Sequence, residues 1–183
     1  MTFATWWRGD PLPNLPSLSS FSAHPSADAQ LIARLTNRLQ QAFVARFQAG
    51  DRLYLASMND IPVAYGWVAT QEGRISELQW AFALPARNCY LYNFFTPPEW
   101  RGRGIYPHLL QAIIRQESSF DHFWIGYMPD NTASGRGISK AGFQVVSDLV
   151  VTDGRVYGLT LFESSERALA SVDVFHLPVI ATP

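Results

Sequence analysis

Apolar residues change their spacing several times along this chain, and each change predicts a different element. Between Ser26 and Gly50 they recur at steps of three and four residues, the period of one face of an α-helix. Ser26 is a suitable N-cap and Gly50 a suitable helix end, so we expect a helical stretch, with a bend that would divide it into two helices. The apolar positions are Leu31, Ile32, Leu35, Leu39, Ala42, Phe43 and Phe47.

Two pairs of extended runs are typical of β-hairpins. Residues 52–58 and 61–68 are rich in strand-forming residues and are separated by a short polar turn. Residues 144–151 and 155–162 flank a turn that contains Asp153-Gly154, which is a strong hairpin signal.

The strongest strand signal is followed directly by an amphipathic helix. Residues 88–96 are dense in aromatic side chains and end at a Pro-Pro pair. The next periodic stretch predicts a helix over 105–119. A shorter helix is expected over 131–141, ended by Gly142 as its C-cap and Phe143 as the accompanying hydrophobic residue. Further extended segments are expected at 18–23, 75–84 and 120–127.

Helices and strands alternate, which predicts a mixed α and β fold (α+β) with one central sheet. The length of 183 residues fits one domain. Three proline residues between positions 9 and 17 favour an extended segment, so we expect residues 1–17 to form a leader over the surface. The domain is then expected at 18–162, and residues 163–183 form a tail whose structure the pattern does not predict.

Composition excludes several classes of protein. A hydrophobic fraction of 48% with a net charge of −1 is unlike a disordered chain and provides no overall positive field for nucleic acid. No secretory signal and no apolar run long enough to span a membrane is found, so a cytoplasmic protein is expected. Cys89 is the single cysteine and is expected to be buried. Asp121 and His122 have no partner at metal-ligand spacing, so no metal is expected.

Residues 96–106 carry the clearest chemical signal. The stretch joins the strongest strand to the best helix and contains Arg101, Gly102, Arg103 and Gly104. Glycines allow a ligand to approach the backbone, and the N–H groups of a helix N-terminus together with arginines can bind phosphate. The alternative is an ordinary strand-to-helix turn with solvated arginines. The Lys-Ser/Thr ending of a P-loop is missing, and so is the third glycine of a dinucleotide fingerprint.

This stretch resembles the acyl-CoA-binding motif of the GNAT superfamily of N-acyltransferases. Arg101 and Gly104 match the family's Arg/Gln-x-x-Gly-x-Gly/Ala, whereas Tyr106 stands where the family has Gly or Ala. A second segment downstream, with Asn131, Ser134 and then residues 140–143 (KAGF), is similar to the family's Asn…Gly-Phe segment.

The resemblance implies a twisted, mostly antiparallel mixed sheet with helices on both faces and two splayed strands that form a cleft for CoA. Acetyl-CoA or another acyl-CoA is the implied co-substrate, with its pyrophosphate on the N–H groups of the motif and its pantetheine arm along the first splayed strand. The residues implied to bind it are Phe94, Phe95, Thr96, Arg101, Gly102, Arg103, Gly104, Ile105, Tyr106, Asn131 and Ser134. For Asn131 the alternative is an ordinary helix N-cap, and both roles are compatible.

The catalytic groups are less evident. Many family members use a tyrosine as the acid at the position that Ile138 occupies here, so this chain lacks the usual acid. An amine acceptor has a pKa of about 10.4 and needs help to lose its proton. Candidate bases are Glu77 and Tyr92, and Tyr127 is a candidate acid. Around Glu77, the walls of the acceptor pocket are expected from aromatic residues that suit a protein core equally well: Tyr65, Trp67, Trp80 and Phe82.

The sequence therefore predicts an acyl-CoA-dependent N-acyltransferase that acts on a small-molecule amine, without nucleic acid or membrane as partner and with homodimerisation left open. A first alternative is a GNAT-fold module that binds CoA or acyl-CoA without catalysis. A second is an interaction protein that docks a partner through Trp6-Trp7 or through the tail 163–183.

Overall fold

The computed structural model describes residues 1–36 and 40–181. Eight strands form one sheet in the order β10-β9-β1-β8-β7-β4-β3-β2. Neighbouring strands are antiparallel except β7 and β8, which run parallel. The strands are β1 (Thr2–Trp7), β2 (Phe21–Ser26), β3 (Arg52–Met58), β4 (Ile61–Ala69), β7 (Asn88–Phe95), β8 (His122–Tyr127), β9 (Gln144–Thr152) and β10 (Arg155–Leu161).

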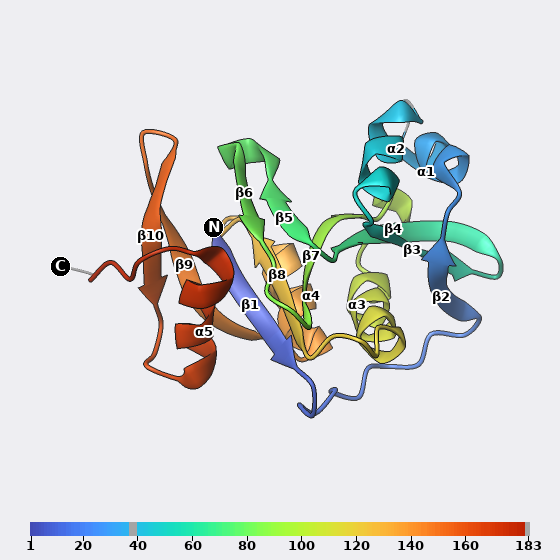
Figure 1. Ribbon diagram of the computed structural model, residues 1–183. Helices are drawn as coiled ribbons and strands as arrows, with labels where there is room; N and C mark the ends of the chain where they lie inside the picture. Colours follow the sequence, from blue (N-terminus) through green and yellow to red (C-terminus); the bar gives the residue numbers. More distant parts are fainter. Residues whose placement is uncertain (37–39, 182–183) are drawn as a thin grey trace.

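Helices cover both faces of this sheet (Figure 1). On one face, α3 (Ile105–Gln116) and α4 (Thr132–Ala141) pack over the alternate strand residues that include Ala64, Val68, Cys89 and Leu91. The opposite face holds the intervening residues, such as Trp67, Tyr90 and Trp124. It is covered by α1 (Ala29–Thr36), α2 (Gln41–Gln48), α5 (Glu166–Phe175) and a small hairpin of β5 (Glu72–Ile75) and β6 (Trp80–Ala83).

Most of the predicted elements are confirmed. The stretch 26–50 contains α1 and α2, and both predicted hairpins are present as β3–β4 and β9–β10. The predicted strand 88–96 is β7, and the helix predicted over 105–119 is α3. Helix α4 ends as expected, because Gly142 has a φ of 106° and the N–H of Phe143 donates to the carbonyl of Ile138.

The prediction of an extended leader over residues 1–17 is wrong for its first part. Residues 2–7 form β1, which lies inside the sheet and pairs with both β8 and β9. Phe3 and Ala4 have no exposed surface and Trp6 only 3%. A strand buried on both faces lacks the alternation of polar and apolar residues that reveals a half-buried strand. The proline-rich segment 10–18 does lack regular structure, and the strand expected at 18–23 begins later, at Phe21.

The tail that the pattern could not place contains α5, which packs against the sheet. The ring of Phe175 stacks on Phe3 with centroids 3.9 Å apart. The guanidinium of Arg167 donates to both carboxylate oxygens of Asp10, over 2.5 and 2.6 Å. The first strand, the segment after it and the last helix are thus held together, so the expected boundaries at 18 and 162 do not separate the core from its ends.

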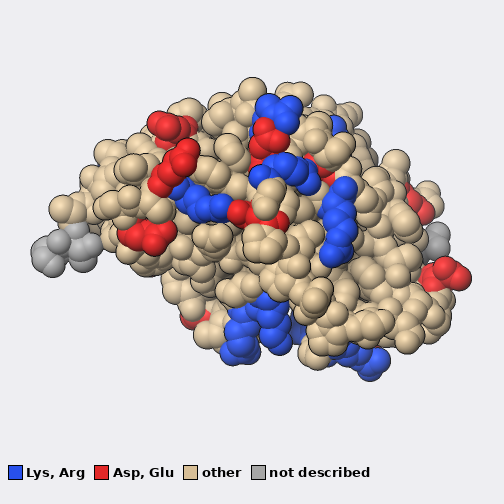
Figure 2. Space-filling model, turned by 90° about the horizontal axis from the view of Figure 1, so that it is seen from below, with Lys and Arg blue, Asp and Glu red and all other residues tan. Residues whose placement is uncertain are grey.

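Four ion pairs join described side chains: Arg52 with Glu117, Arg74 with Glu72, Arg87 with Asp121 and Arg167 with Asp10. On the face seen from below, blue and red side chains are intermixed across the centre (Figure 2). Glu117, at the end of α3, is only 3% exposed, pairs with Arg52 and accepts a hydrogen bond from Tyr54 over 3.0 Å. In the described residues, no helix combines the length and the apolar character that crossing a bilayer requires.

Candidate functional site

The parallel strands β7 and β8 separate at their carboxyl ends. They pair from Asn88 with His122 as far as Leu91 with Ile125, and the described ladder goes no further. Beyond these residues, Asn93–Phe95 of β7 and Gly126–Tyr127 of β8 run on without pairing to each other. We call this place, where the two strand ends no longer pair, the slot; α3 follows β7 and α4 follows β8 in the chain.

A β-bulge in β7 lies at the edge of the slot. Tyr92 pairs with Trp67 and Phe95 with Tyr65, so two residues, Asn93 and Phe94, face the single Gly66 of β4. Asn93 has a φ of 52°, and the ring of Phe94 lies over Gly66, where a Cβ atom would be 2.1 Å from Phe94 Cε1. A bulge re-aims the strand that carries it. Here it reorients the backbone of residues 93–95, which include the positions implied to bind the pantetheine arm.

The other end of the slot is the loop before α3. Gly102 and Gly104 have φ values of 74° and 79°, which favour glycine, and Gly104 is the N-cap of α3. Arg101 to Gly104 are all exposed, and the Nε of Arg101 donates to the carbonyl of Thr96 over 2.9 Å. This bond joins the loop to the end of β7. The backbone N–H groups of the first helical turn, the helix dipole and the two arginines together form a site suited to phosphate groups.

Helix α4 begins beside this loop. The side-chain oxygen of Asn131 accepts the N–H of Ser134 over 3.1 Å, which is the N-cap role weighed as an alternative. The cap uses the oxygen, so the amide nitrogen of the exposed Asn131 stays available to a ligand. Ser134 is hydrogen-bonded to the hydroxyl of Tyr106, whose pKa is raised by burial. The sequence-predicted residues from β7, α3 and α4 are therefore brought together along the slot.

Tyr106, the departure from the family motif, is accommodated by a glycine on the neighbouring helix. A Cβ atom on Gly137 would lie 2.5 Å from Cδ1 of Tyr106, so the ring occupies the space above that residue. The ring also meets Phe94 edge-on, with centroids 5.2 Å apart. The large side chain thus packs between β7 and α4 and does not extend over the exposed loop.

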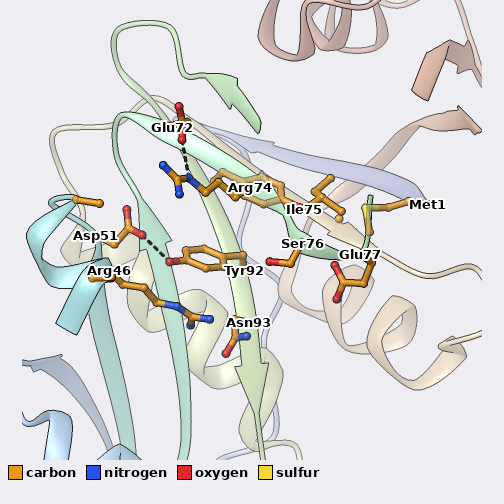
Figure 3. A pocket seen from close by; sticks show the side chains of 14 residues that line it. Met1, Arg46, Asp51, Glu72, Arg74, Ile75, Ser76, Glu77, Tyr92 and Asn93 are labelled. Atoms are coloured by element: carbon orange, nitrogen blue, oxygen red, sulfur yellow. Dashed lines mark hydrogen bonds and ion pairs between the residues drawn. The ribbon is translucent and has the colours of Figure 1, made fainter. Parts of the chain in front are cut away.

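A pocket of about 370 Å³ opens at the slot on the opposite face of the sheet. Asn93 (Figure 3) and Gly126, where β7 and β8 separate, lie in its wall. Its other walls come from α2, from the β5–β6 hairpin and from the start of β3. Five charged residues line it: Arg46, Asp51, Glu72, Arg74 and Glu77.

Two of the predicted catalytic residues, Glu77 and Tyr92, line this pocket. The hydroxyl of Tyr92 donates to Asp51 over 2.5 Å. Burial, followed by the hydrogen bond to Asp51, raises the pKa of Tyr92 well above its usual value. The Tyr92 hydroxyl is therefore held as a hydrogen-bond donor at neutral pH, which disfavours it as the base, and its catalytic role stays a prediction. Glu77 belongs to the single turn η1 (Ser76–Leu78), is exposed, and makes no hydrogen bond or ion pair with another residue of the described ranges.

Asp51 is a pocket carboxylate that sequence reasoning missed. It follows the glycine that ends α2, where an acidic residue reads as an ordinary turn residue. Burial raises the pKa of its carboxyl group, against the lowering effects of the Tyr92 hydrogen bond and of nearby arginines. No local pattern reveals its place opposite Tyr92.

Tyr127 lies apart from the pocket that holds Glu77 and Tyr92. It packs on α4, where a Cβ atom on Gly135 would be 2.8 Å from Cε2 of the ring. Burial raises its pKa, and its hydroxyl is hydrogen-bonded to Thr2. Tyr127 is the last residue of β8, at the slot. Its role as the acid stays a prediction.

The aromatic residues expected as pocket walls belong mostly to the core. Trp67 has no exposed surface, Tyr65 has 3% and Phe82 has 4%. Trp80 packs against Phe82 and Phe175. None of these four lines the pocket. Ile138, at the family's tyrosine position, is fully buried in the core under α3. Among residues 1–36 and 40–181, no group of three or more His, Cys, Asp or Glu side chains is placed to hold a metal ion.

Comparison with known proteins identifies the fold. No protein-family model matches the chain, and no curated protein matches it in sequence. Among solved structures, the aminoglycoside N-acetyltransferase AAC(6')-Iy, in complex with the bisubstrate analog CoA-S-monomethyl-acetylneamine, has a TM-score of 0.55 at 16% identity; the match covers 73% of this chain and 97% of that one. A Salmonella typhimurium structure named as an acetyltransferase, yncA, with its cofactor acetyl-CoA, has a TM-score of 0.51 at 15% identity. The match covers 81% of this chain and 97% of yncA.

A GNAT-family protein from Novosphingobium aromaticivorans gives a TM-score of 0.52 at 14% identity, covering 79% of this chain. The match spans 59% of the Novosphingobium protein. The chain has the GNAT fold. The fold class that the two motifs implied is thus confirmed, and the GNAT fold accounts for the splayed strands and for the helices that begin beside them.

Proposed function

We propose that this protein transfers an acyl group, with acetyl-CoA as the donor, to the amine of a small molecule. The observation that carries the proposal is the slot between β7 and β8, which joins two chemically different sites. On one side lies the exposed, arginine-bearing N-terminus of α3, and on the other a pocket lined by carboxylates. The CoA-bound and acetyl-CoA-bound states named for structures of the same fold support this donor.

Each part of the slot has a task in this reaction. The loop 101–106 holds the pyrophosphate, and the backbone of Phe94–Thr96 binds the pantetheine arm as an added strand would. The amine nitrogen attacks the thioester carbonyl carbon, and the N–H of Phe95 stabilises the oxyanion that develops. The carbon–sulfur bond then breaks, and the CoA thiolate takes up a proton.

The pocket provides the base. Glu77 is the first candidate to accept the amine proton, because its carboxylate is exposed to the pocket and is not engaged elsewhere. Asp51 is the second candidate, since it lines the same pocket, although Tyr92 already donates to it. A CoA thiolate, with a pKa near ~8.5 by analogy with cysteine, needs little acid assistance, so the buried Ile138 does not prevent turnover.

Thermal unfolding with and without acetyl-CoA tests the donor site. At about 100 times its dissociation constant, a ligand adds roughly 2.7 kcal/mol, or some 5–10 °C for a domain of this size. Gly104→Glu is expected to abolish the shift, because it places a carboxylate at the phosphate site. Gly154→Glu is the matched control, since Gly154 also has a positive φ, 73°, and lies in the β9–β10 turn. A wild-type protein that folds but shows no shift would contradict the proposal.

One observation favours a second function, acyl-CoA binding without catalysis: Ile138 replaces the usual acid and is buried. Turnover decides between the two functions. Release of free CoA in the presence of an amine panel supports the transferase, whereas a thermal shift without CoA release from any amine supports the binding module.

A further inference from the structure

The charged residues of the pocket are not equally engaged. Arg74 pairs with Glu72 over 2.5 Å, and Asp51 accepts a hydrogen bond from the hydroxyl of Tyr92. Arg46 differs, because its Nη1 atom is buried and has no hydrogen-bond partner among the described residues. Nη1 itself is covered by protein and is not open to a ligand. Asp51 is the carboxylate that acts on Arg46, yet no described residue accepts a hydrogen bond from the guanidinium. Because Arg46 lines the pocket, its donors other than Nη1 can pair with an anionic group there.

Aromatic rings hold Arg46 in place. It lies in the last turn of α2, with its guanidinium carbon 5.2 Å from the ring centroids of both Trp67 and Tyr92. These cation–π contacts fix the plane of the group without using its hydrogen-bond donors. Figure 3 shows the guanidinium passing beside the ring of Tyr92 toward Asn93, at the edge of the slot. A donor fork fixed in this way matches the geometry of a planar carboxylate.

We infer that the acceptor is an amine that also carries a carboxylate, of the amino-acid type. Its carboxylate binds Arg46, and its amine faces Glu77 on the opposite wall of the pocket (Figure 3). This inference rests on the proposed acyl transfer and specifies its substrate class. The carboxylates of Asp51, Glu72 and Glu77 disfavour a multiply charged phosphate, and a pocket of about 370 Å³ is at the small end for ligand sites.

Matched substrates test the inference. Amino acids are compared with their primary amides, which keep the amine and replace only the charged oxyanion, in steady-state assays with saturating acetyl-CoA. We expect kcat/KM for the acid to exceed that for its amide by roughly tenfold or more, as for one charge-assisted hydrogen-bonded pair. Arg46→Met should lower the value for the acid by about 10–100-fold and change the amide by less than about threefold. Arg155→Met, in an exposed position of β10, is the control and should change neither.

Two further measurements make the test decisive. Arg46→Lys keeps the charge but loses the paired donors of the guanidinium, so its kcat/KM for the acid should lie between those of wild type and Arg46→Met. It also serves as the test variant if Arg46→Met does not fold. Calorimetric titration of the same acid and amide into CoA-saturated protein compares their dissociation constants without turnover.

The outcomes are distinct. Equal or better use of the amides, or equal loss of both substrates in Arg46→Met, would overturn the carboxylate assignment while leaving acyl transfer intact. Absence of any acetyl-CoA shift in the wild-type protein would instead overturn the proposed function, and the substrate class with it.

Discussion

The hydroxyl of Tyr92 lies 2.5 Å from a carboxylate oxygen of Asp51, and this contact joins the central strand β7 to the point where α2 passes into β3. It occupies a hydroxyl and a carboxylate that both line the candidate acceptor pocket. Because burial and this hydrogen bond raise the pKa of Tyr92, the tyrosine hydroxyl keeps its proton through the neutral range. Tyr92 and Asp51 are thus engaged with each other, whereas Glu77, the first candidate base in our proposal, is exposed in the same pocket.

Substitution of the two predicted bases should consequently have unequal effects. Tyr92→Phe is expected to lower kcat by less than about tenfold, whereas Glu77→Gln should lower it by about 10²-fold or more, the usual contribution of a general base. Steady-state kinetics with acetyl-CoA and an accepted amine measure both. Glu163→Gln, at an exposed position before α5, is the control. A larger loss in Tyr92→Phe than in Glu77→Gln would reverse the assignment.

Asp51 should make stability depend on pH in a defined direction. Burial raises the pKa of Asp51 in the folded protein. Between the unfolded-state pKa of about 3.9 and this higher folded-state pKa, the folded protein binds more protons than the unfolded chain, so the free energy of unfolding falls as pH rises through that range. Asp51→Asn removes the cost of burying a charged carboxylate, and its amide oxygen can still accept the hydrogen bond from Tyr92. We expect the variant to be more stable than wild type at pH 7, with the difference shrinking toward pH ~4.

Urea unfolding at several pH values measures this difference. Asp173→Asn, on the exposed side of α5, provides the comparison and should show no such trend. A stability difference for Asp51→Asn that is constant with pH, or that grows on acidification, would contradict the raised pKa.

Tyr106 and Gly137 should behave as a coupled pair. Gly137→Ala brings a Cβ atom to 2.5 Å from Cδ1 of Tyr106, and overpacking of this kind costs about 1–3 kcal/mol of unfolding free energy. In a Tyr106→Ala background the clash is absent, so the same substitution should be neutral or stabilising by up to ~1 kcal/mol through helix propensity. A double-mutant cycle by urea unfolding measures the coupling. Additive effects would show that the helices adjust their separation.

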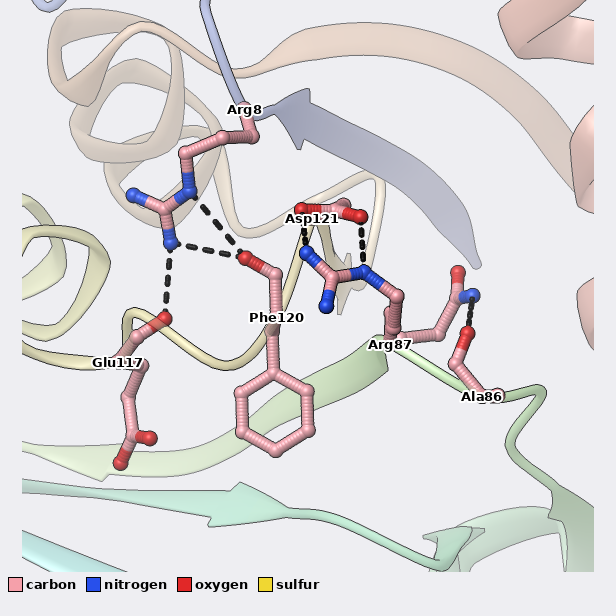
Figure 4. A network of polar contacts seen from close by, with 7 residues as sticks. Arg8, Ala86, Arg87, Glu117, Phe120 and Asp121 are labelled. Atoms are coloured by element: carbon pink, nitrogen blue, oxygen red, sulfur yellow. Dashed lines mark hydrogen bonds and ion pairs between the residues drawn. The ribbon is translucent and has the colours of Figure 1, made fainter.

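Arg8 should stabilise the junction between β1 and the end of α3. Its guanidinium donates to the carbonyls of Glu117 and Phe120 over 2.8–3.2 Å (Figure 4) and to that of Ile114 over 3.1 Å. Arg8→Ala is expected to lower the free energy of unfolding by about 1–2 kcal/mol, since these bonds are partly exposed to water. The acetyl-CoA-induced shift should be unchanged, because this junction is at the end of α3 remote from the phosphate loop. Thermal unfolding of Arg8→Ala and Arg8→Lys with and without acetyl-CoA tests both statements.

The sequence by itself determined the elements that depend on nearby residues. The periodicity of residues 26–50 and 105–119 requires only an amphipathic face, and Gly142 ends α4 because its φ of 106° favours glycine. The predicted phosphate loop is local too: β7, residues 96–104 and α3 follow one another directly, so the chain itself places the loop at the end of the strand.

Tertiary structure alone decided the candidate acceptor pocket and the ends of the fold. Asp51 and Tyr92 are 41 positions apart and meet only because β4 lies between β3 and β7 in the sheet. Likewise Arg46 reaches the pocket from a helix whose packing, and not its sequence, sets where its polar side points. Strand β1 enters the sheet between β8 and β9, and α5 covers it, through contacts such as Phe3 with Phe175. Such long-range pairing follows from how the hydrophobic surfaces fit together, which no local window of the sequence contains.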